Sequence, residues 1–225
     1  MLLLSPFAIL SQTVSATFFN IPQQKVYLNA YTGLYMETLD SVMMSQDKRV
    51  EFNAQMKKGM YQLETEFGYS VDFLYDDALI KMLVKDIDDI NSIVFIDSQT
   101  NNDWYAYQNI KEHTLNSLDL LKPILRNYDK DSDFYMNAKN EYQYLQDSFA
   151  SFTDSLMLHD NYASNLIKVD RFPLINLDED FDKQRKDMIA NFFEDVDFND
   201  TSLIPTDVLT NKILDFLSIQ IGRAH

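Results

Sequence analysis

The chain has 225 residues, of which 46% are apolar and 13% aromatic, so it can bury a sizeable core and is expected to fold. Its formal net charge of −16 argues against nucleic-acid binding, which needs a basic surface, and against docking on an anionic membrane. There is no cysteine, which excludes disulfides, zinc–thiolate sites and thiol chemistry, and the four glycines cannot form a dinucleotide or phosphate loop.

Residues 1–12 are short and apolar, a pattern typical of the hydrophobic part of a secretory signal peptide. They are too few to span a membrane, because a transmembrane helix needs about 20 apolar residues. The signal is expected to be incomplete, because leucines follow Met1 directly and the positively charged start is missing. Cleavage after Ser11 or after Ala16 would fit. The alternative interpretation of this segment is a buried first strand.

Residues 13–98 are predicted to form a β-sandwich domain. Apolar and polar residues alternate in short runs, as in Val26, Leu28 and Ala30, and turn residues separate the runs. The pattern gives about eight strands and predicts an antiparallel sandwich in an α+β protein. Tyrosines on these strands suggest a face that could hold a glycan or a peptide, although aromatic residues on strands usually serve sheet packing. The candidate ligand face consists of Tyr27, Tyr31, Tyr61 and Tyr75.

Residues 99–171 are predicted to form a helical hairpin region. An N-cap is expected at residues 101–103, and Pro123 should kink the first helix or end it near Lys122. The second helix is expected to be about 25 residues long and to carry one apolar stripe, which is more often core than a partner surface. The stripe is Ala138, Tyr142, Leu145, Phe149, Phe152 and Leu156, and the residues expected off it are Glu141, Gln143, Gln146 and Asp147.

A shorter helix over residues 162–169 should break at Arg171-Phe172-Pro173. Residues 172–220 are then predicted to form a helical domain. It has helices over residues 178–194 and 208–219, joined by a loop over residues 195–205. The apolar side of the first is expected at Phe181, Met188, Ile189, Phe192 and Phe193, and that of the second at Leu209, Ile213, Phe216 and Leu217.

No residue in this pattern predicts catalysis, cofactor binding or metal binding. The acidic run at residues 195–200 resembles the start of a calcium loop, but Asp200 stands where glycine is needed and Thr206 where glutamate is needed. Its aspartates are instead expected to cap the following turn. His113 and His159 share no motif, and the pairs at residues 76–77 and 88–89 are typical of turns.

Two regions of the chain resemble parts of exported thiol-disulfide oxidoreductases of the TlpA/ResA type from Gram-negative bacteria. The later region contains Asn191-Phe192-Phe193, Val196-Asp197-Phe198-Asn199-Asp200, Leu203-Ile204 and Lys212-Ile213-Leu214-Asp215-Phe216-Leu217. The earlier region contains Lys25-Val26-Tyr27-Leu28, Leu39-Asp40-Ser41 and Val50-Glu51-Phe52. The resemblance covers most of residues 13–220 and implies a location in the periplasm or cell envelope. It also implies that a thioredoxin-like domain with a Cys-x-x-Cys pair follows.

This chain departs from the family because it contains no cysteine and therefore no redox nucleophile. Its last five residues match one reading frame of a common sequencing adapter, and the alternative is a natural tail with Gly222 as helix C-cap. The expected function is a non-catalytic accessory region of an envelope thiol-disulfide oxidoreductase, serving cell redox homeostasis. Its partners would be the missing domain, another envelope protein or a second copy of the chain. The alternative is a self-contained exported module that binds a glycan or a peptide on the sandwich.

Overall fold

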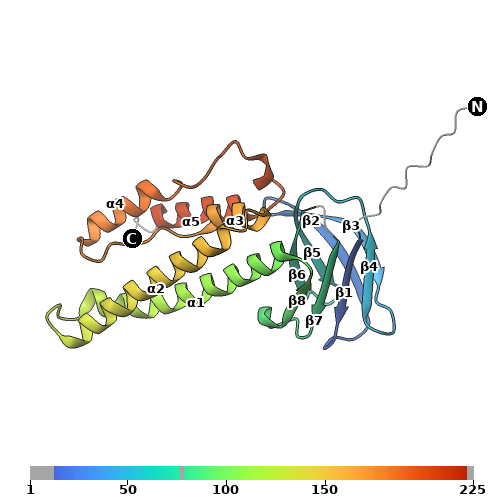
Figure 1. Cartoon of the computed structure of the whole chain (residues 1–225), viewed down its shortest axis with the longest axis horizontal. Coiled ribbons are helices and arrows are strands. Elements are labelled where there is room, and N and C mark those ends of the chain that lie inside the picture. Colours follow the sequence, from blue (N-terminus) through green and yellow to red (C-terminus); the bar gives the residue numbers. More distant parts are fainter. Residues whose placement is uncertain (1–12, 77–78, 222–225) are drawn as a thin grey trace, which may run out of the picture. The chain divides into compact units, whose positions relative to one another are not determined.

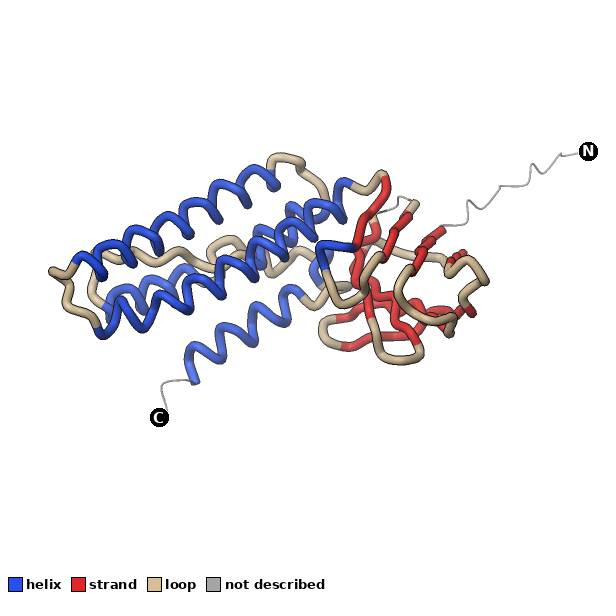
Figure 2. The backbone as a smooth tube through the Cα atoms, turned by 90° about the horizontal axis from the view of Figure 1, so that it is seen from below, coloured by secondary structure: helices blue, strands red, loops and turns tan. Residues whose placement is uncertain are grey.

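The computed structural model describes residues 13–76 and 79–221 and divides them into two compact units (Figure 1). The β unit comprises residues 13–31, 35–76 and 79–98, and the helical unit comprises residues 32–34 and 99–221. Figure 2 shows that strands are confined to the first and α-helices to the second. The segments expected to be a signal peptide, residues 1–12, and most of the expected adapter tail, residues 222–225, lie outside the described residues.

The β unit contains eight strands in two four-stranded sheets, which confirms the α+β class and the strand number. One sheet has the order β4-β1-β7-β8 and the other the order β3-β2-β5-β6. The strands are β1 (Thr13–Phe18), β2 (Lys25–Thr32), β3 (Tyr35–Met43), β4 (Arg49–Asn53), β5 (Gly59–Thr65), β6 (Ser70–Tyr75), β7 (Ile80–Val84) and β8 (Ile93–Ile96). The short 3-10 helix η1 (Ile90–Ser92) precedes β8.

The expectation of a purely antiparallel arrangement is wrong at one pair of strands. β1 pairs with β4 in the antiparallel sense but with β7 in the parallel sense, with Val14 opposite Ile80. A parallel pair needs a long crossover connection, and here the whole second sheet lies between β1 and β7 in the chain. Because β1 is central, cleavage after Ala16 would cut it, whereas Ser11 precedes it.

Successive side chains of a strand point to opposite faces of the sheet, and in each sheet the apolar residues lie on one face. In the first sheet Val14 lies opposite Phe52 and Ile80, and all three side chains are fully buried. In the second sheet Leu28 lies opposite Leu63, and Leu63 lies opposite Val71. Residues that lie directly opposite each other in a sheet point to the same face, so each sheet presents one continuous apolar side.

The helical unit is built on two long helices, α1 (Gln99–Asn127) and α2 (Asp133–Met157), which lie side by side as an antiparallel pair (Figures 1 and 2). α3 (Tyr162–Asp170) packs against α1, α2 and α5. α4 (Phe181–Asn191), the 3-10 helix η2 (Thr201–Leu203) and α5 (Val208–Ile221) complete the unit. The capping box at Asn161 and Ser164 fixes the start of α3.

The expected start of α1 is corrected, and so is one of the two outcomes expected at Pro123. The helix begins at Gln99 rather than after residues 101–103, and Asn101 and Asp103 are buried within its first turns. Pro123 does not end the helix near Lys122, because a proline in the last turns costs one backbone bond while the rest of the helix stays packed along α2. The carbonyl of Pro123 accepts a hydrogen bond from Asn127 Nδ2 at 2.8 Å, which helps to complete this end.

The buried stripe of α2 differs from the expected one at two positions. Ala138, Tyr142, Phe149 and Leu156 are buried as predicted, but Leu145 is half-buried and Phe152 is 38% exposed. Gln146 and Thr153 take their places at 1% and 0% exposure. A strict 3-4 alternation follows a 3.5-residue repeat, whereas a straight helix turns every 3.6 residues, so the buried line drifts toward residues 146 and 153.

The last two helices also depart from the expected apolar faces. α4 is shorter than predicted and has no buried residue, and Phe181 at its start is 58% exposed. In α5 the buried residues are Val208 and Lys212, whereas Ile213 and Leu217 are 38% and 44% exposed. Helical spacing locates an apolar stripe, but only packing decides which side of a short helix is covered.

Candidate functional site

The four tyrosines expected to form one ligand face lie on two opposite faces of the second sheet. Tyr61 lies opposite Phe73 and shares the apolar face with Tyr75, and both tyrosines are at most 5% exposed. Tyr61 Oη donates to the Lys57 carbonyl at 2.7 Å and accepts from the Lys57 amide at 2.9 Å. These two tyrosines are core residues.

Tyr27 and Tyr31 lie on the other face of the sheet. There Tyr31 belongs to a hydrogen-bonded network of polar side chains. Tyr31 Oη donates to Asp72 Oδ1 at 3.0 Å, and Gln62 Nε2 donates to the same oxygen at 2.9 Å. Burial raises the pKa of Asp72, although both hydrogen bonds oppose that shift. The alternation of the strand therefore separates residues 27 and 31 from residues 61 and 75.

Several of the acidic residues considered from the sequence have structural roles, and His113 is exposed. Asp195 pairs with Arg171, and Asp200 caps η2 by accepting from the Ser202 amide at 2.9 Å, as expected for a capping loop. Asp89 likewise caps η1. Among residues 13–76 and 79–221, no group of three or more histidine or acidic side chains could hold a metal ion.

The structure brings together a buried carboxylate and a histidine that sequence spacing did not connect. Asp103 in α1 is 2% exposed, and its Oδ2 lies 2.8 Å from His159 Nδ1 and 2.6 Å from Asn161 Nδ2. Its Oδ1 accepts from Gln99 Nε2 at 2.7 Å. This cluster ties the start of α1 to the connection between α2 and α3.

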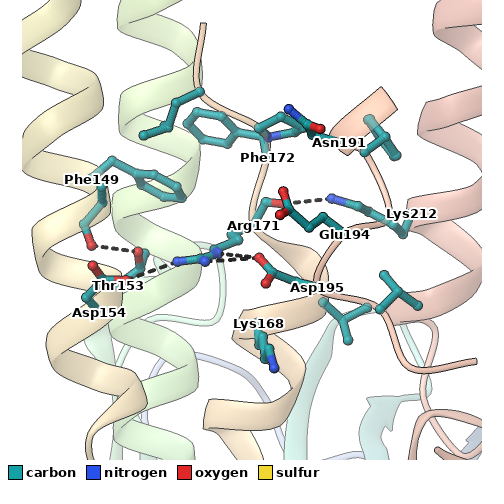
Figure 3. Close-up of a pocket in the computed structure, with 16 residues that line it drawn as sticks. Phe149, Thr153, Asp154, Lys168, Arg171, Phe172, Asn191, Glu194, Asp195 and Lys212 are labelled. Atoms are coloured by element: carbon teal, nitrogen blue, oxygen red, sulfur yellow. Dashed lines mark hydrogen bonds and ion pairs between the residues drawn. The ribbon is translucent and has the colours of Figure 1, made fainter. Parts of the chain in front are cut away.

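The most unusual group of the helical unit is Lys212, a lysine that is only 4% exposed. Its Nζ donates to the carbonyl oxygen of Arg171 at 2.7 Å and lies 4.3 Å from the ring centre of Phe192 (Figure 3). Burial lowers the pKa of Lys212 to about 8; Asp170 opposes the shift and Lys111 adds to it. A lysine in such a place holds a much larger share of its amine in the neutral form than an exposed lysine does.

The carbonyl that Lys212 contacts belongs to an extended segment, residues 171–175, that follows α3. Arg171 bridges Asp154 of α2 and Asp195 of the later loop, with N–O distances of 3.0 Å to each (Figure 3). Phe172 stacks on Phe149 of α2 at a centroid distance of 4.3 Å. The segment is thus fixed on one side by an ion-pair bridge and on the other by an aromatic stack.

Gln146 holds the far end of the same segment. Its Nε2 donates to the Ile175 carbonyl at 2.9 Å, and its Oε1 accepts from the Ile175 amide at 2.7 Å. The side chain amide therefore pairs with one residue of extended backbone as a neighbouring strand would. This explains why a glutamine occupies the buried stripe of α2.

Two cavities adjoin this segment, and Lys212 lies on the wall of both. One has a volume of about 360 Å³ and is bordered by Phe149, Arg171 and Asp195 (Figure 3). The other has a volume of about 370 Å³ and is bordered by Lys111, Asp170 and Met188. Phe172, Pro173 and Phe192 line both. Both cavities therefore combine apolar and charged side chains, and Lys212 is the buried amine that they share.

The sequence contains a signal for this site, although no known motif describes it. Val208, Lys212 and Phe216 are spaced by four residues, so they lie along one side of α5, and a lysine within an apolar row indicates a buried amine. Gln146 gives the same kind of signal in α2. The partners of both groups, in residues 171–175, are distant in sequence and have no local pattern.

None of the helices in the described ranges is long and apolar enough to cross a membrane. In comparisons with known proteins, no protein-family model, no curated protein and no solved structure matches this chain.

Proposed function

We propose that this chain is a non-catalytic accessory region of an envelope thiol-disulfide oxidoreductase, and that it positions a thioredoxin-like domain or selects partners for it. The proposal rests on the resemblance of residues 185–220 to that family. The observation that supports it is the uncovered apolar side of α5, the last helix of this region. Leu214 and Leu217 are both 44% exposed there, and Ile213 is 38% exposed.

An apolar helix side of this kind is suited to packing against a further folded domain. The occupant that we propose is the thioredoxin-like domain that follows the corresponding region in the family. The chain itself contains no cysteine, so the redox thiols would belong to that domain. The accessory role also agrees with the polar groups of the helical unit, because Gln146 and Arg171 hold its own segments together.

The decisive experiment is long-read sequencing of the source DNA across the codon for Gln220. We expect an open frame that continues into a domain with a Cys-x-x-Cys pair. A frame that ends after His225, or that encodes no thioredoxin-like domain, would overturn the proposal. If the frame continues, Leu217→Asp in the full protein should loosen the docking of that domain in limited proteolysis, whereas Ser218→Asp, at the exposed neighbouring residue, should not.

We further propose that the two sheets of the β unit pack face to face as a sandwich. Both sheets have one apolar side, and Phe52 of the first and Phe73 of the second are fully buried. A double-mutant cycle with Phe52→Leu and Phe73→Leu tests this arrangement. A coupling energy above about 0.5 kcal/mol would support facing sheets, whereas simple additivity would show that these two rings are not in contact.

The alternative function, glycan or peptide binding, now rests on Tyr27 and Tyr31 only, because Tyr61 and Tyr75 are core residues. Tyr31 is also engaged with Asp72 and Gln62. Glycan and peptide arrays probed with the purified chain would show saturable binding that Tyr27→Ala removes if this alternative holds. Empty arrays would count against it.

A further inference from the structure

The amine of Lys212 has more hydrogen-bonding capacity than the fold uses. An ammonium group has three N–H donors, and among the described residues the Arg171 carbonyl is the acceptor that Lys212 Nζ reaches. The ring of Phe192 covers another side of the group at 4.3 Å. A buried ammonium with a single oxygen acceptor is costly, so burial shifts the protonation equilibrium of Lys212 toward the neutral amine. A neutral amine can still donate to the carbonyl while its lone pair points elsewhere.

The space next to this amine is large enough for a small organic molecule. Cavities of about 360 Å³ and 370 Å³ adjoin Lys212, and both are within the range of about 300–1,000 Å³ that is common for ligand pockets. Phe172, Pro173 and Phe192 supply apolar walls to both cavities. A small molecule with an aromatic or aliphatic body would bury the apolar surface of these three side chains when it binds.

Two of the other cations around the cavities, Arg171 and Lys111, already have partners, whereas Lys168 at the first cavity is exposed. Arg171 is paired with Asp154 and Asp195, and Lys111 Nζ is paired with Asp170 Oδ2 at 2.7 Å. An anionic ligand would therefore have to compete with carboxylates of the protein for these cations. An uncharged ligand avoids that competition, and its polar atom needs only the amine of Lys212.

We propose that Lys212 is a nucleophilic amine that forms an imine with a small, uncharged aldehyde or ketone held in these cavities, the first of which is shown in Figure 3. The nitrogen lone pair attacks the carbonyl carbon, so that a C–N bond forms and the carbonyl π pair moves to oxygen. The two protons of the amine are transferred to that oxygen, directly or through water, and it leaves as water. One amine and one carbonyl compound thus give one imine and one water, without an oxidant or a reductant.

The electrostatic surroundings support this role. With a pKa of about 8, roughly one tenth of Lys212 is neutral at pH 7, against about 0.04% of an ordinary lysine with a pKa near 10.4. The charged groups that act on the amine come from several elements: Lys111 of α1, Asp170 of α3, Asp195 of the loop before η2, and Asp215 of α5. This inference does not depend on the accessory function proposed above, because it concerns a cavity inside the helical unit.

The test is reductive trapping on the intact chain with benzaldehyde and sodium cyanoborohydride at pH 7, followed by peptide mapping of every lysine. We expect a benzyl group at Lys212 at least ten times faster than at exposed lysines, with a rate that saturates as the benzaldehyde concentration rises. Lys168 is the matched control, since it lines the first cavity but is exposed. The preference for Lys212 should vanish when the chain is unfolded in guanidinium chloride.

Two variants complete the design. Lys212→Arg keeps a donor for the Arg171 carbonyl but has no nucleophilic amine, so the fast, saturable labelling should disappear and only the slow labelling of the exposed lysines should remain. Lys168→Arg should leave the labelling of Lys212 unchanged. The proposal is overturned if Lys212 in the folded wild-type chain is labelled no faster than the exposed lysines, or if its labelling rises linearly with benzaldehyde and does not saturate.

Discussion

The β unit and the helical unit bury different kinds of side chain. The sheets of the β unit bury apolar side chains along alternating positions, with Phe52, Leu63 and Phe73 fully buried. Among the described residues, the charged side chains that are less than a tenth exposed are Asp103, Asp170 and Lys212, and all of them belong to the helical unit.

The difference follows from how backbone groups are satisfied. Strands pair their own amides and carbonyls across a sheet, so their side chains can be purely apolar. The helical unit contains an extended segment, residues 171–175, that has no strand beside it. Gln146 and Lys212 supply partners for its backbone, so one glutamine and one lysine are buried beside this segment. Asp103 and Asp170 are instead buried with side-chain partners of their own.

The largest effect is expected from removing apolar volume in the β unit. Phe73→Ala should lower the free energy of unfolding by about 3–5 kcal/mol, because the fully buried ring leaves a cavity. Urea denaturation followed by circular dichroism measures the loss. Phe67→Ala is the control, because Phe67 is 67% exposed and its removal should change stability by less than about 0.5 kcal/mol. Equal losses for the two variants would contradict the apolar core of this unit.

In the helical unit the next largest effect is expected at a buried charge. Asp103→Ala leaves Gln99, His159 and Asn161 without their acceptor and should cost about 3 kcal/mol. Trp104, the single tryptophan, adjoins the cluster, so its fluorescence reports the transition. Asp119→Ala on the same helix removes only an exposed ion pair with Lys122 and should be nearly neutral. A small loss for Asp103→Ala would show that the cluster does not stabilise the unit.

Removing the glutamine that pairs with the extended segment should have an intermediate effect. Gln146→Ala leaves the Ile175 amide and carbonyl unpaired and should lower the free energy of unfolding by about 2 kcal/mol. Gln143→Ala is matched in residue type and helix, but the side chain of Gln143 is exposed and donates a hydrogen bond to Asp147 Oδ1 on the same helix. Hydrogen exchange should also quicken at Ile175 in the first variant and not in the second. Unchanged exchange there would refute the role assigned to Gln146.

A smaller effect, dependent on pH, is expected for Lys212. Its pKa of about 8 in the folded chain is below the value of about 10.4 expected after unfolding, so the unfolded chain binds more protons between these values. Stability of the wild type relative to Lys212→Met should therefore rise from pH 8 to pH 10, by about 1 kcal/mol per pH unit. Below pH 8 the difference should be constant. Chemical denaturation at several pH values measures it, and a flat difference across pH 8–10 would contradict the lowered pKa.

The smallest effect is expected at the exposed end of the arginine bridge. Asp154 is 64% exposed at its side chain, so Asp154→Ala should change stability by less than about 1 kcal/mol. Asp195→Ala, at the less exposed end, should cost more than Asp154→Ala in the same denaturation experiment. The reverse order would mean that solvent exposure does not govern these two ion pairs.

Periodicity predicted much of the fold and little of the candidate site. The alternation along β2, β4 and β5 and the long stripe of α2 gave the right element types, because local spacing decides which face of an element can be buried. The same spacing wrongly placed Gln146 off the buried stripe of α2. It also wrongly assigned Ile213 and Leu217 to the buried side of α5, because the spacing of apolar residues along one helix does not show which other elements pack against it. The four tyrosines were grouped by residue type, and the strand register then separated them.

The sequence alone determined the α+β class, the change from strands to helices near residue 99, and the lack of any thiol, since these follow from composition and local period. Only the tertiary structure decided that β1 lies beside β7, that Asp103 meets His159, and that Lys212 is buried against residues 171–175. Each of these contacts joins residues that are far apart in the chain. Such contacts depend on the closure of long loops and on the packing of the whole core, which no short window of sequence contains.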